Sequence, residues 1–222
     1  CCMSKKIALL GEKDNFFLAL KDRLERAGAI FTHDSTDADI TVGLGQYATN
    51  DLVDVAIIAE NDDPRSGNLD QIKNAGLIIR IHDLMIPEGS QGWGPIDVED
   101  WVEWIRVESL DLTPEIKPKH WVHIRDTTDA VSLLVMADTD AFAQGVIDLC
   151  GRRAWTPDAV ISEINLLWHR FTNAITNSHT VESLSGIPSP AAIQYEGKRL
   201  RPDLKPLHEA MQNAGREEGW RP

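Results

Sequence analysis

The sequence predicts an α/β fold: a parallel sheet flanked by helices, with a smaller C-terminal α/β part. Over the first third of the chain, short apolar runs alternate with segments of helical periodicity, the order typical of strands joined by crossover helices. The apolar runs are continuous rather than alternating, as expected for strands buried on both faces. The chain of 222 residues is long enough for one domain with a small appendage.

Five apolar runs near the N-terminus have β-strand character. They lie at residues 6–10, 29–32, 38–43, 53–59 and 77–81. Between the first two, apolar residues recur at helical spacing over 16–24, with Asp14 or Asn15 as the expected N-cap and Gly28 as the expected end. A second, short helix is expected at 68–75.

The second half of the chain begins with a loop rich in glycine and proline at 87–95. The elements expected after it are helices at 97–107, 126–137, 156–174 and 207–214, and strands at 121–124 and 145–149. Thr156 followed by Pro157 is a strong start signal for the third of these helices. We therefore divide the chain into a sheet-forming part at 3–96 and a smaller part at 97–222. The smaller part is expected to complete the sheet and add a substrate-side lobe, in one compact unit.

The charge and cysteine content exclude several classes of protein. An excess of 35 acidic over 22 basic residues gives a net charge of −13, and an acidic surface repels nucleic acid and anionic membranes. The longest uncharged apolar stretch, 130–137, is too short to span a bilayer. Three cysteines cannot make a disulfide framework, so we expect a cytoplasmic protein. Cys1 and Cys2 precede a natural start at Met3 and are expected to be left over from expression.

The turn after the first apolar run has the layout of a nucleotide-binding turn. A strand, then Gly11, then a helix offers backbone N–H groups and a positive dipole end to a pyrophosphate. Asp34 follows the second strand, where an acidic residue would bind ribose hydroxyls. The glycine pattern of such turns is incomplete, because Asp14 and Phe17 occupy two of its three glycine positions. Lys13 would partly offset the charge of Asp14. Gly11, Lys13 and Asp34 are the candidate cofactor-binding residues, and a turn that binds nothing is the alternative.

Seven segments, in order along the chain, resemble motifs of one enzyme family. They lie at 5–24, 37–45 (DADITVGLG), 76–89 (GLIIRIHDLMIPEG), 121–130 (WVHIRDTTDA), 151–156 (GRRAWT), 201–203 (RPD) and 219–222 (GWRP). The first is similar to a strand–turn–helix unit, and the others to segments such as ADVVIHLA, LRxxNVYGPG and FVHVDDVADA. Together they resemble the extended short-chain dehydrogenase/reductase family, which includes nucleotide-sugar epimerases and dehydratases. Each segment is short, and their order is the specific part of the resemblance.

This resemblance implies a Rossmann-like fold, NAD or NADP as the cofactor, and a nucleotide sugar as the substrate or ligand. It also implies a catalytic Tyr with a Lys four residues later. The chain has two tyrosines: Tyr47 is followed at that distance by Asp51, and Tyr195 by Arg199. The catalytic residues are therefore unknown, enzyme status is open, and a chain without cofactor is an equal alternative.

A local basic cluster near the C-terminus is the candidate substrate-binding site. It contains Arg199 and Arg201, with Asp203 two residues further on. Arginine side chains bind phosphate oxygens in a bidentate manner. The resemblance implies that this segment would hold the diphosphate of a nucleotide sugar. A solvated loop is the alternative.

Three further features have structural explanations that compete with functional ones. His120 and His123, with Asp126 nearby, could contribute to a metal site or be ordinary histidines of a strand. Cys150 could be activated by nearby arginines or simply buried. The seven tryptophans could line an aromatic pocket, although packing is the favoured explanation.

Three functions are compatible with these observations. The first is an atypical NAD-dependent epimerase/dehydratase-like protein that acts on or binds a nucleotide sugar. The second is a non-catalytic nucleotide- or nucleotide-sugar-binding or regulatory module derived from that family. The third is a structural subunit that associates with a partner or with itself, for example as a homodimer.

Overall fold

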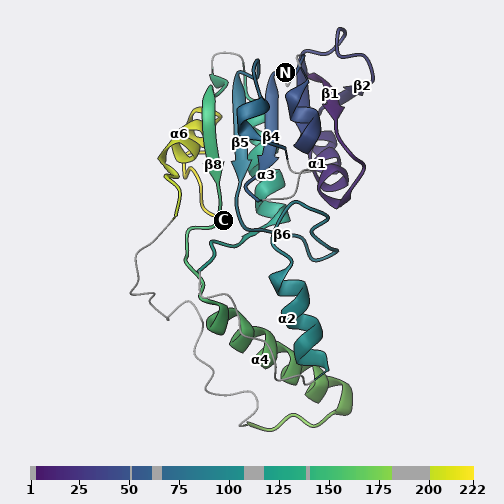
Figure 1. The fold of residues 1–222 in the computed structure, drawn as a ribbon, viewed down its shortest axis with the longest axis vertical. Coiled ribbons are helices and arrows are strands. Elements are labelled where there is room, and N and C mark those ends of the chain that lie inside the picture. The colour runs from purple at the N-terminus through teal and green to yellow at the C-terminus, as the bar shows by residue number, and fades with distance from the viewer. Residues whose placement is uncertain (1–3, 51, 62–66, 108–117, 139–140, 182–200) are drawn as a thin grey trace. The chain divides into compact units, whose positions relative to one another are not determined.

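The computed structural model describes residues 4–50, 52–61, 67–107, 118–138, 141–181 and 201–222 (Figure 1). The chain forms two compact units. The first contains Cys1–Pro95, Trp121–Arg152 and Arg201–Pro222, and the second contains Ile96–His120 and Arg153–Leu200. Each unit is described by itself below.

Six parallel strands form the sheet of the first unit. In order across the sheet they are β2 (Ile30–Thr32), β1 (Lys6–Leu10), β3 (Ile40–Leu44), β4 (Val55–Ala59), β5 (Leu77–Ile81) and β8 (Gly145–Leu149). The chain runs outward from β1 to β2 and then returns to β3 on the other side of β1. Ligands of open α/β sheets bind where the strand order reverses in this way. The architecture confirms the Rossmann-like α/β fold.

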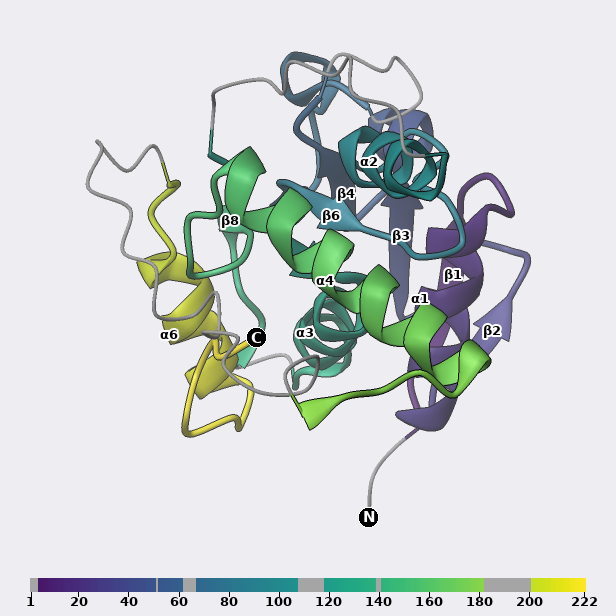
Figure 2. The same cartoon turned by 90° about the horizontal axis from the view of Figure 1, so that it is seen from below.

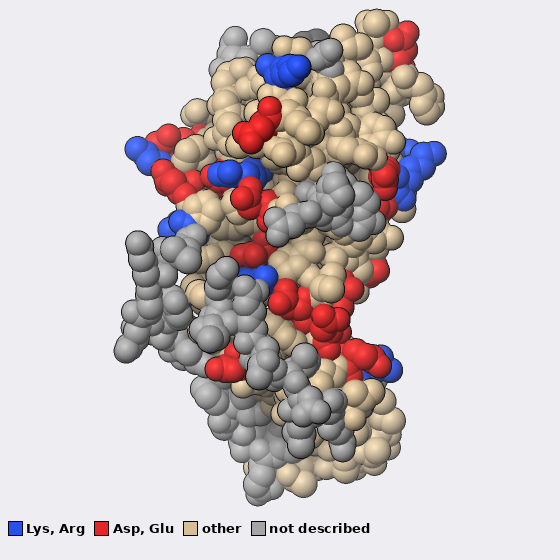
Figure 3. Space-filling model, viewed as in Figure 1, with Lys and Arg blue, Asp and Glu red and all other residues tan. Residues whose placement is uncertain are grey.

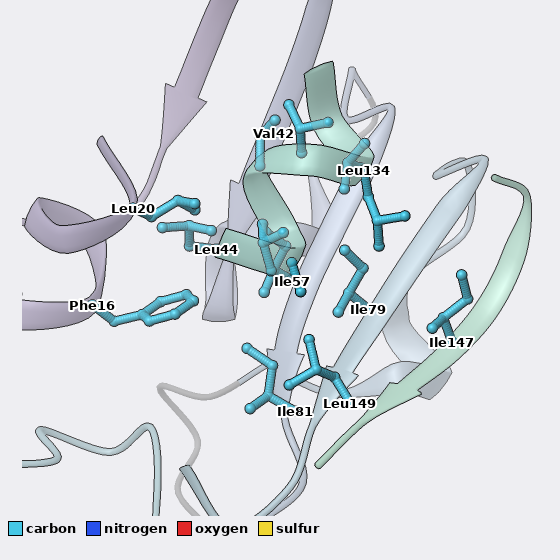
Figure 4. Close-up of a cluster of buried hydrophobic side chains, with 14 of the residues drawn as sticks. Phe16, Leu20, Val42, Leu44, Ile57, Ile79, Ile81, Leu134, Ile147 and Leu149 are labelled. Atoms are coloured by element: carbon cyan, nitrogen blue, oxygen red, sulfur yellow. The ribbon is translucent and has the colours of Figure 1, made fainter. Parts of the chain in front are cut away.

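One face of this sheet carries the main core. Three helices contribute to it: α1 (Asn15–Arg26), α3 (Ile124–Met136) and α6 (Lys205–Asn213). Side chains such as Phe16, Leu20, Ile57, Ile79 and Leu134 interdigitate there and are almost fully buried (Figure 4). The continuous apolar runs therefore supply the buried face of the sheet, as the sequence predicts.

The ends of α1 confirm two predictions from the sequence. The Asp14 carboxylate accepts a hydrogen bond from the Phe17 backbone N–H at 2.8 Å, which makes Asp14 the N-cap. Gly28 follows the helix with φ of 95°, in the left-handed region that favours glycine. Strong capping at both ends fixes where the chain leaves β1 and enters β2.

The opposite face of the sheet has a smaller core, made of Ala48, Val53, Ala56 and Ile58. Among the described residues, the 3₁₀ turns η1 (Gly45–Thr49) and η3 (Leu69–Gln71) border it. The prediction of a helix at 68–75 is wrong, because only the single 3₁₀ turn η3 forms there. The backbone becomes extended at Ile72, and the side chains of Ile72 and Ala75 pack onto the small core. A two-stranded parallel ladder, β6 (Leu84–Met85) with β7 (Val122–His123), completes the first unit.

Among its described residues, the second unit contains the helices α2 (Asp97–Arg106) and α4 (Pro157–Thr176). Thr156 caps α4 through a 3.3 Å hydrogen bond from the Ala159 N–H to its hydroxyl, and Pro157 opens the helix as predicted. Asp97 pairs with Lys119 at 3.3 Å at the start of α2. Within the described parts of the chain, no helix has the length and apolar character needed to cross a membrane.

Candidate functional site

The candidate cofactor site is the turn between β1 and α1, at the carboxyl end of the sheet where the strand order reverses. Gly11 lies at its start in tight surroundings. A Cβ added to Gly11 would lie 3.1 Å from both Leu44 and Phe17, so the glycine is needed for packing inside the protein.

The N-terminus of α1 already has a negatively charged partner. One carboxylate oxygen of Asp14 accepts from the Phe17 N–H, and the other accepts from the Trp93 indole N–H at 2.7 Å. A pyrophosphate bound at a helix N-terminus would use the same kind of backbone donor and the same positive dipole end. The Asp14 carboxylate therefore occupies the electrostatic position that a pyrophosphate requires.

The loop at 86–95 is fastened to the same helix end. The amide oxygen of Gln91 accepts from the Asn15 backbone N–H at 2.8 Å, and the Asn15 side-chain amide donates to the carbonyls of Glu88 and Gly89. The Trp93 ring lies against Phe16, with ring centroids 4.4 Å apart. These contacts join the loop to α1 by both hydrogen bonds and apolar packing.

Little space remains between the loop and the turn. The cavity there has a volume of about 10 Å³, and Glu12, Asp14, Gln46, Tyr47 and Trp93 are among its lining residues. A second carboxylate, that of Glu12, accepts from the Gln46 amide at 2.9 Å. A cavity of this size holds at most about one water molecule. The residues present do not fit a dinucleotide pyrophosphate at the start of α1, on grounds of both volume and charge.

Asp34 and Lys13 lie at the same edge of the sheet as Gly11. In the β1–β2 register Ala8 is opposite Thr32, so Asp34 is level with the end of β1. Hydrogen bonds from the Thr36 hydroxyl and the Thr36 backbone N–H lower the pKa of the Asp34 carboxyl. Both bonds reach the same oxygen, Oδ1. A ribose-binding role for Asp34 stays a prediction, as does a role for Lys13, which is exposed and follows Glu12 in the turn.

The candidate substrate-binding residues are only partly described. Arg199 lies outside the described residues. The exposed Arg201 donates to the Arg152 carbonyl at 3.1 Å, and Asp203 accepts from the Lys205 N–H at 2.9 Å at the start of α6. Each of these two side chains has a local structural role, and diphosphate binding by them stays a prediction.

The described residues contain no Tyr–Lys pair of the kind that the resemblance implies. Tyr47 lies in η1 and is partly exposed, whereas Tyr195 falls outside the described residues. Cys150 is fully buried, and this burial raises the pKa of its thiol to about 12, so the thiol is protonated and unreactive at neutral pH. Trp93 and Trp101 are buried in the protein, which supports packing as their role.

The histidine cluster also has a structural explanation. His123 caps α3, since its Nδ1 accepts from the Arg125 N–H at 3.1 Å. Among the residues that the structure describes, no three His, Cys, Asp or Glu side chains are grouped so that they could hold a metal ion.

An ionic cluster that sequence reasoning missed lies on β5 and β8. Arg80 and Asp148 are paired in the strand register, and the carboxylate of Asp148 accepts from Arg80 Nε at 2.6 Å and contacts His82 Nε2 at 2.7 Å. Glu60, just after β4, lies 3.6 Å from Arg80. The sequence does contain a signal for this cluster: one charged residue lies inside each of two apolar runs, Arg80 in 77–81 and Asp148 in 145–149.

Comparison with known proteins adds information at the level of fold. No protein-family model matches the sequence, and no curated protein matches it. Among solved structures, RMD from Pseudomonas aeruginosa, complexed with NADPH, is similar with a TM-score of 0.55 and 11% identity, over 95% of this chain and 92% of that chain. A proposed NAD-dependent epimerase/dehydratase from Methylobacillus flagellatus is similar with a TM-score of 0.52 and 10% identity, over 75% and 83% of the chains. UDP-N-acetylglucosamine 4-epimerase from Bacillus cereus gives a TM-score of 0.50 and 12% identity, over 73% and 81%.

These structures share the fold of this chain. Two of them are described as an epimerase and an epimerase/dehydratase, the class that the sequence segments resemble, so the resemblance is confirmed at the level of fold. One of them holds NADPH. At identities of 10–12% the likeness extends to the fold alone.

Proposed function

We propose that this chain is a non-catalytic module built on the fold of NAD-dependent epimerases/dehydratases. It keeps the parallel sheet but binds no dinucleotide at the β1–α1 turn and performs no hydride transfer. The observation that carries the proposal is the double hydrogen bonding of Asp14, to the Phe17 N–H and to the Trp93 indole. A cytoplasmic location is part of the proposal.

Two further observations support the proposal. The cavity beside Asp14 measures about 10 Å³, far below the several hundred Å³ typical of cofactor and ligand pockets. The described residues also offer no acid/base pair near this turn: Tyr47 has Asp51 rather than a lysine four residues later. The atypical NAD-dependent enzyme remains the competing hypothesis, and it requires the loop at 86–95 to leave α1.

Thermal unfolding with NAD, NADH, NADP, NADPH and a set of nucleotide sugars tests the proposal. A ligand at 100 times its dissociation constant stabilises a protein by about 2.7 kcal/mol, which shifts the unfolding midpoint by several degrees. We expect no shift with any of the four dinucleotides. A shift that is present in the unmodified chain and lost in Asp34→Asn would contradict the proposal, because it would place a dinucleotide at the predicted ribose site.

The nucleotide sugars in the same experiment test the ligand of the module. Arg201 is exposed and carries a guanidinium that could meet a diphosphate. Stabilisation by a nucleotide sugar that is lost in Arg201→Gln would assign nucleotide-sugar binding to this segment. No stabilisation by any nucleotide sugar would favour the structural-subunit form of the module.

A further inference from the structure

The first turn of α3 is held by a single histidine. The helix begins directly after β7, and His123 is both the last residue of β7 and the N-cap of α3. Its Nδ1 accepts from the Arg125 backbone N–H at 3.1 Å. The first four N–H groups of a helix have no partner within the helix. The Arg125 N–H therefore relies on the imidazole of His123 for its hydrogen bond.

This contact fixes the protonation state of the His123 ring. A backbone N–H can only donate, so the Nδ1 atom that it contacts must carry a lone pair and no proton. The ring is then neutral, with its proton on Nε2. A protonated imidazole has N–H groups at both nitrogens and no acceptor. Protonation of His123 therefore breaks the cap in either orientation of the ring, and it places a positive charge at the positive end of the helix dipole.

The groups around His123 act on a charged ring in both directions. Among the described residues, the titratable and charged groups on the elements that pack around it are His82 and Asp83 before β6, Glu88 after β6, Arg125, Asp126 and Asp129 in α3, and Arg23 in α1. The carboxylates attract a charged ring, as does the net charge of −13, whose acidic side chains are red in Figure 3. The guanidiniums repel it. None of these charges gives a protonated ring a lone pair.

The turn that His123 caps has a defined place in the packing. Ile124 is 7% exposed and belongs to the main core. Figure 2 shows α3 lying beside α1, and the two helices line a cavity of about 710 Å³ together with Glu88. Ile124 and Arg125 are among the lining residues. Opening of the first turn would therefore change one wall of this cavity.

We propose that His123 makes the start of α3 an acid-sensitive switch. Histidine side chains gain a proton between about pH 8 and pH 5. The neutral ring caps the helix at the upper end of this range, and the first turn is closed. The cap is lost as the pH falls, because the folded turn requires the unprotonated ring and the open turn does not. The later turns of α3 stay folded, since Val131, Leu134 and Val135 are buried in the core.

Site-resolved amide hydrogen exchange of the full chain, at about pH 8 and about pH 5.5, tests the proposal. The rates are compared as protection factors, which remove the intrinsic dependence of exchange on pH. The protection of the Arg125 N–H should fall by about 5-fold or more in acid. A global acid-unfolding curve would not isolate this effect, because His82 contacts Asp148 and gains attraction when it is protonated.

Three variants separate the cap from the charge. Asparagine caps helices but does not titrate in this range, so His123→Asn should protect the Arg125 N–H equally at both pH values. His123→Ala removes the acceptor and should give weak protection at both. His33→Asn is the matched control, because His33 is an exposed histidine after β2 in the first unit, and this variant should keep the acid response of the unmodified chain.

The nitrogen chemical shifts of His123 provide a measurement that needs no variant. At about pH 8 they should show a neutral ring with its proton on Nε2. A proton on Nδ1, unchanged Arg125 protection in acid, an acid response that persists in His123→Asn, or one that is abolished by His33→Asn would each overturn the proposal. None of these outcomes involves dinucleotide binding, so the failure of one proposal does not decide the other.

Discussion

Replacing Trp93 with alanine is expected to lower the free energy of unfolding by about 3–5 kcal/mol. Trp93 is 5% exposed, its ring packs on the fully buried Phe16, and its indole N–H donates to Asp14. The substitution removes all three contributions and leaves a cavity beneath the loop at 86–95. Urea unfolding followed by far-UV circular dichroism measures the loss, since the remaining tryptophans complicate a fluorescence signal.

Trp93→Phe separates the ring from the hydrogen bond. Phenylalanine keeps an aromatic contact with Phe16 but cannot donate to Asp14, so we expect a clearly smaller loss, with the missing hydrogen bond accounting for about 1 kcal/mol. A Trp93→Ala loss below that of Trp93→Phe would contradict the packing role. We also expect Trp93→Ala to bind no dinucleotide, because Asp14 still caps α1 and Glu12 remains beside it. If Trp93→Ala did bind a dinucleotide, the loop at 86–95 would be covering a functional cofactor site at the β1–α1 turn, and the proposed function would be contradicted.

The sequence was sufficient to predict the strands and the main helices, because each depends on a local pattern. Continuous apolar runs identified β1, β5 and β8 at the observed bounds. Capping signals at Asp14 and Thr156 were equally local and are confirmed. The expected helix at 68–75 failed because its apolar residues pack onto the small core in an extended conformation. There, tertiary packing outweighed helical spacing.

The candidate site was harder to predict, because its contacts join residues far apart in the chain. The sequence identified Asp14 both as a cap and as an obstacle to phosphate, but nothing in it connected Asp14 to a tryptophan 79 residues away. Similarly, Gln91 accepts a hydrogen bond from the backbone N–H of Asn15, which lies 76 residues away in the chain. A tryptophan inside a glycine- and proline-rich loop was the available signal, since such a ring must find apolar surface elsewhere.

Asp148→Asn is expected to lower the free energy of unfolding by about 2–3 kcal/mol at neutral pH. Its carboxylate accepts two hydrogen bonds from Arg80, at 2.6 and 3.1 Å, and contacts His82 at 2.7 Å. An asparagine in the same place has no charge and offers a single acceptor oxygen, which leaves Arg80 partly unpaired. Because the Asp148 and Arg80 side chains are only 18% and 27% exposed, water compensates for little of this loss.

The effect of Asp148→Asn should depend on pH in a defined direction. Burial of the Asp148 carboxyl raises its pKa, but the hydrogen bonds and charges of Arg80 and His82 outweigh burial and lower the pKa below its ordinary value of 3.8. A carboxyl with a lowered folded pKa stabilises the fold fully above its unfolded pKa and loses this contribution as the pH falls through the folded value. The difference between the unmodified chain and Asp148→Asn should therefore be largest at neutral pH and shrink below about pH 4.

Asp129→Asn is the matched control for this prediction. It removes another Asp–Arg pair, that of Asp129 with Arg23, in which both side chains are more than 40% exposed. Exposed ion pairs contribute about 0–1 kcal/mol, so this variant should be nearly as stable as the unmodified chain at neutral pH. Equal losses in Asp129→Asn and Asp148→Asn would mean that the β5–β8 cluster is an ordinary surface pair. If Asp148→Asn loses more free energy of unfolding than Asp129→Asn, and this difference disappears in acid, the stabilisation comes from the paired carboxylate of Asp148. The ion pair would then stabilise the pairing of strand β8 with strand β5.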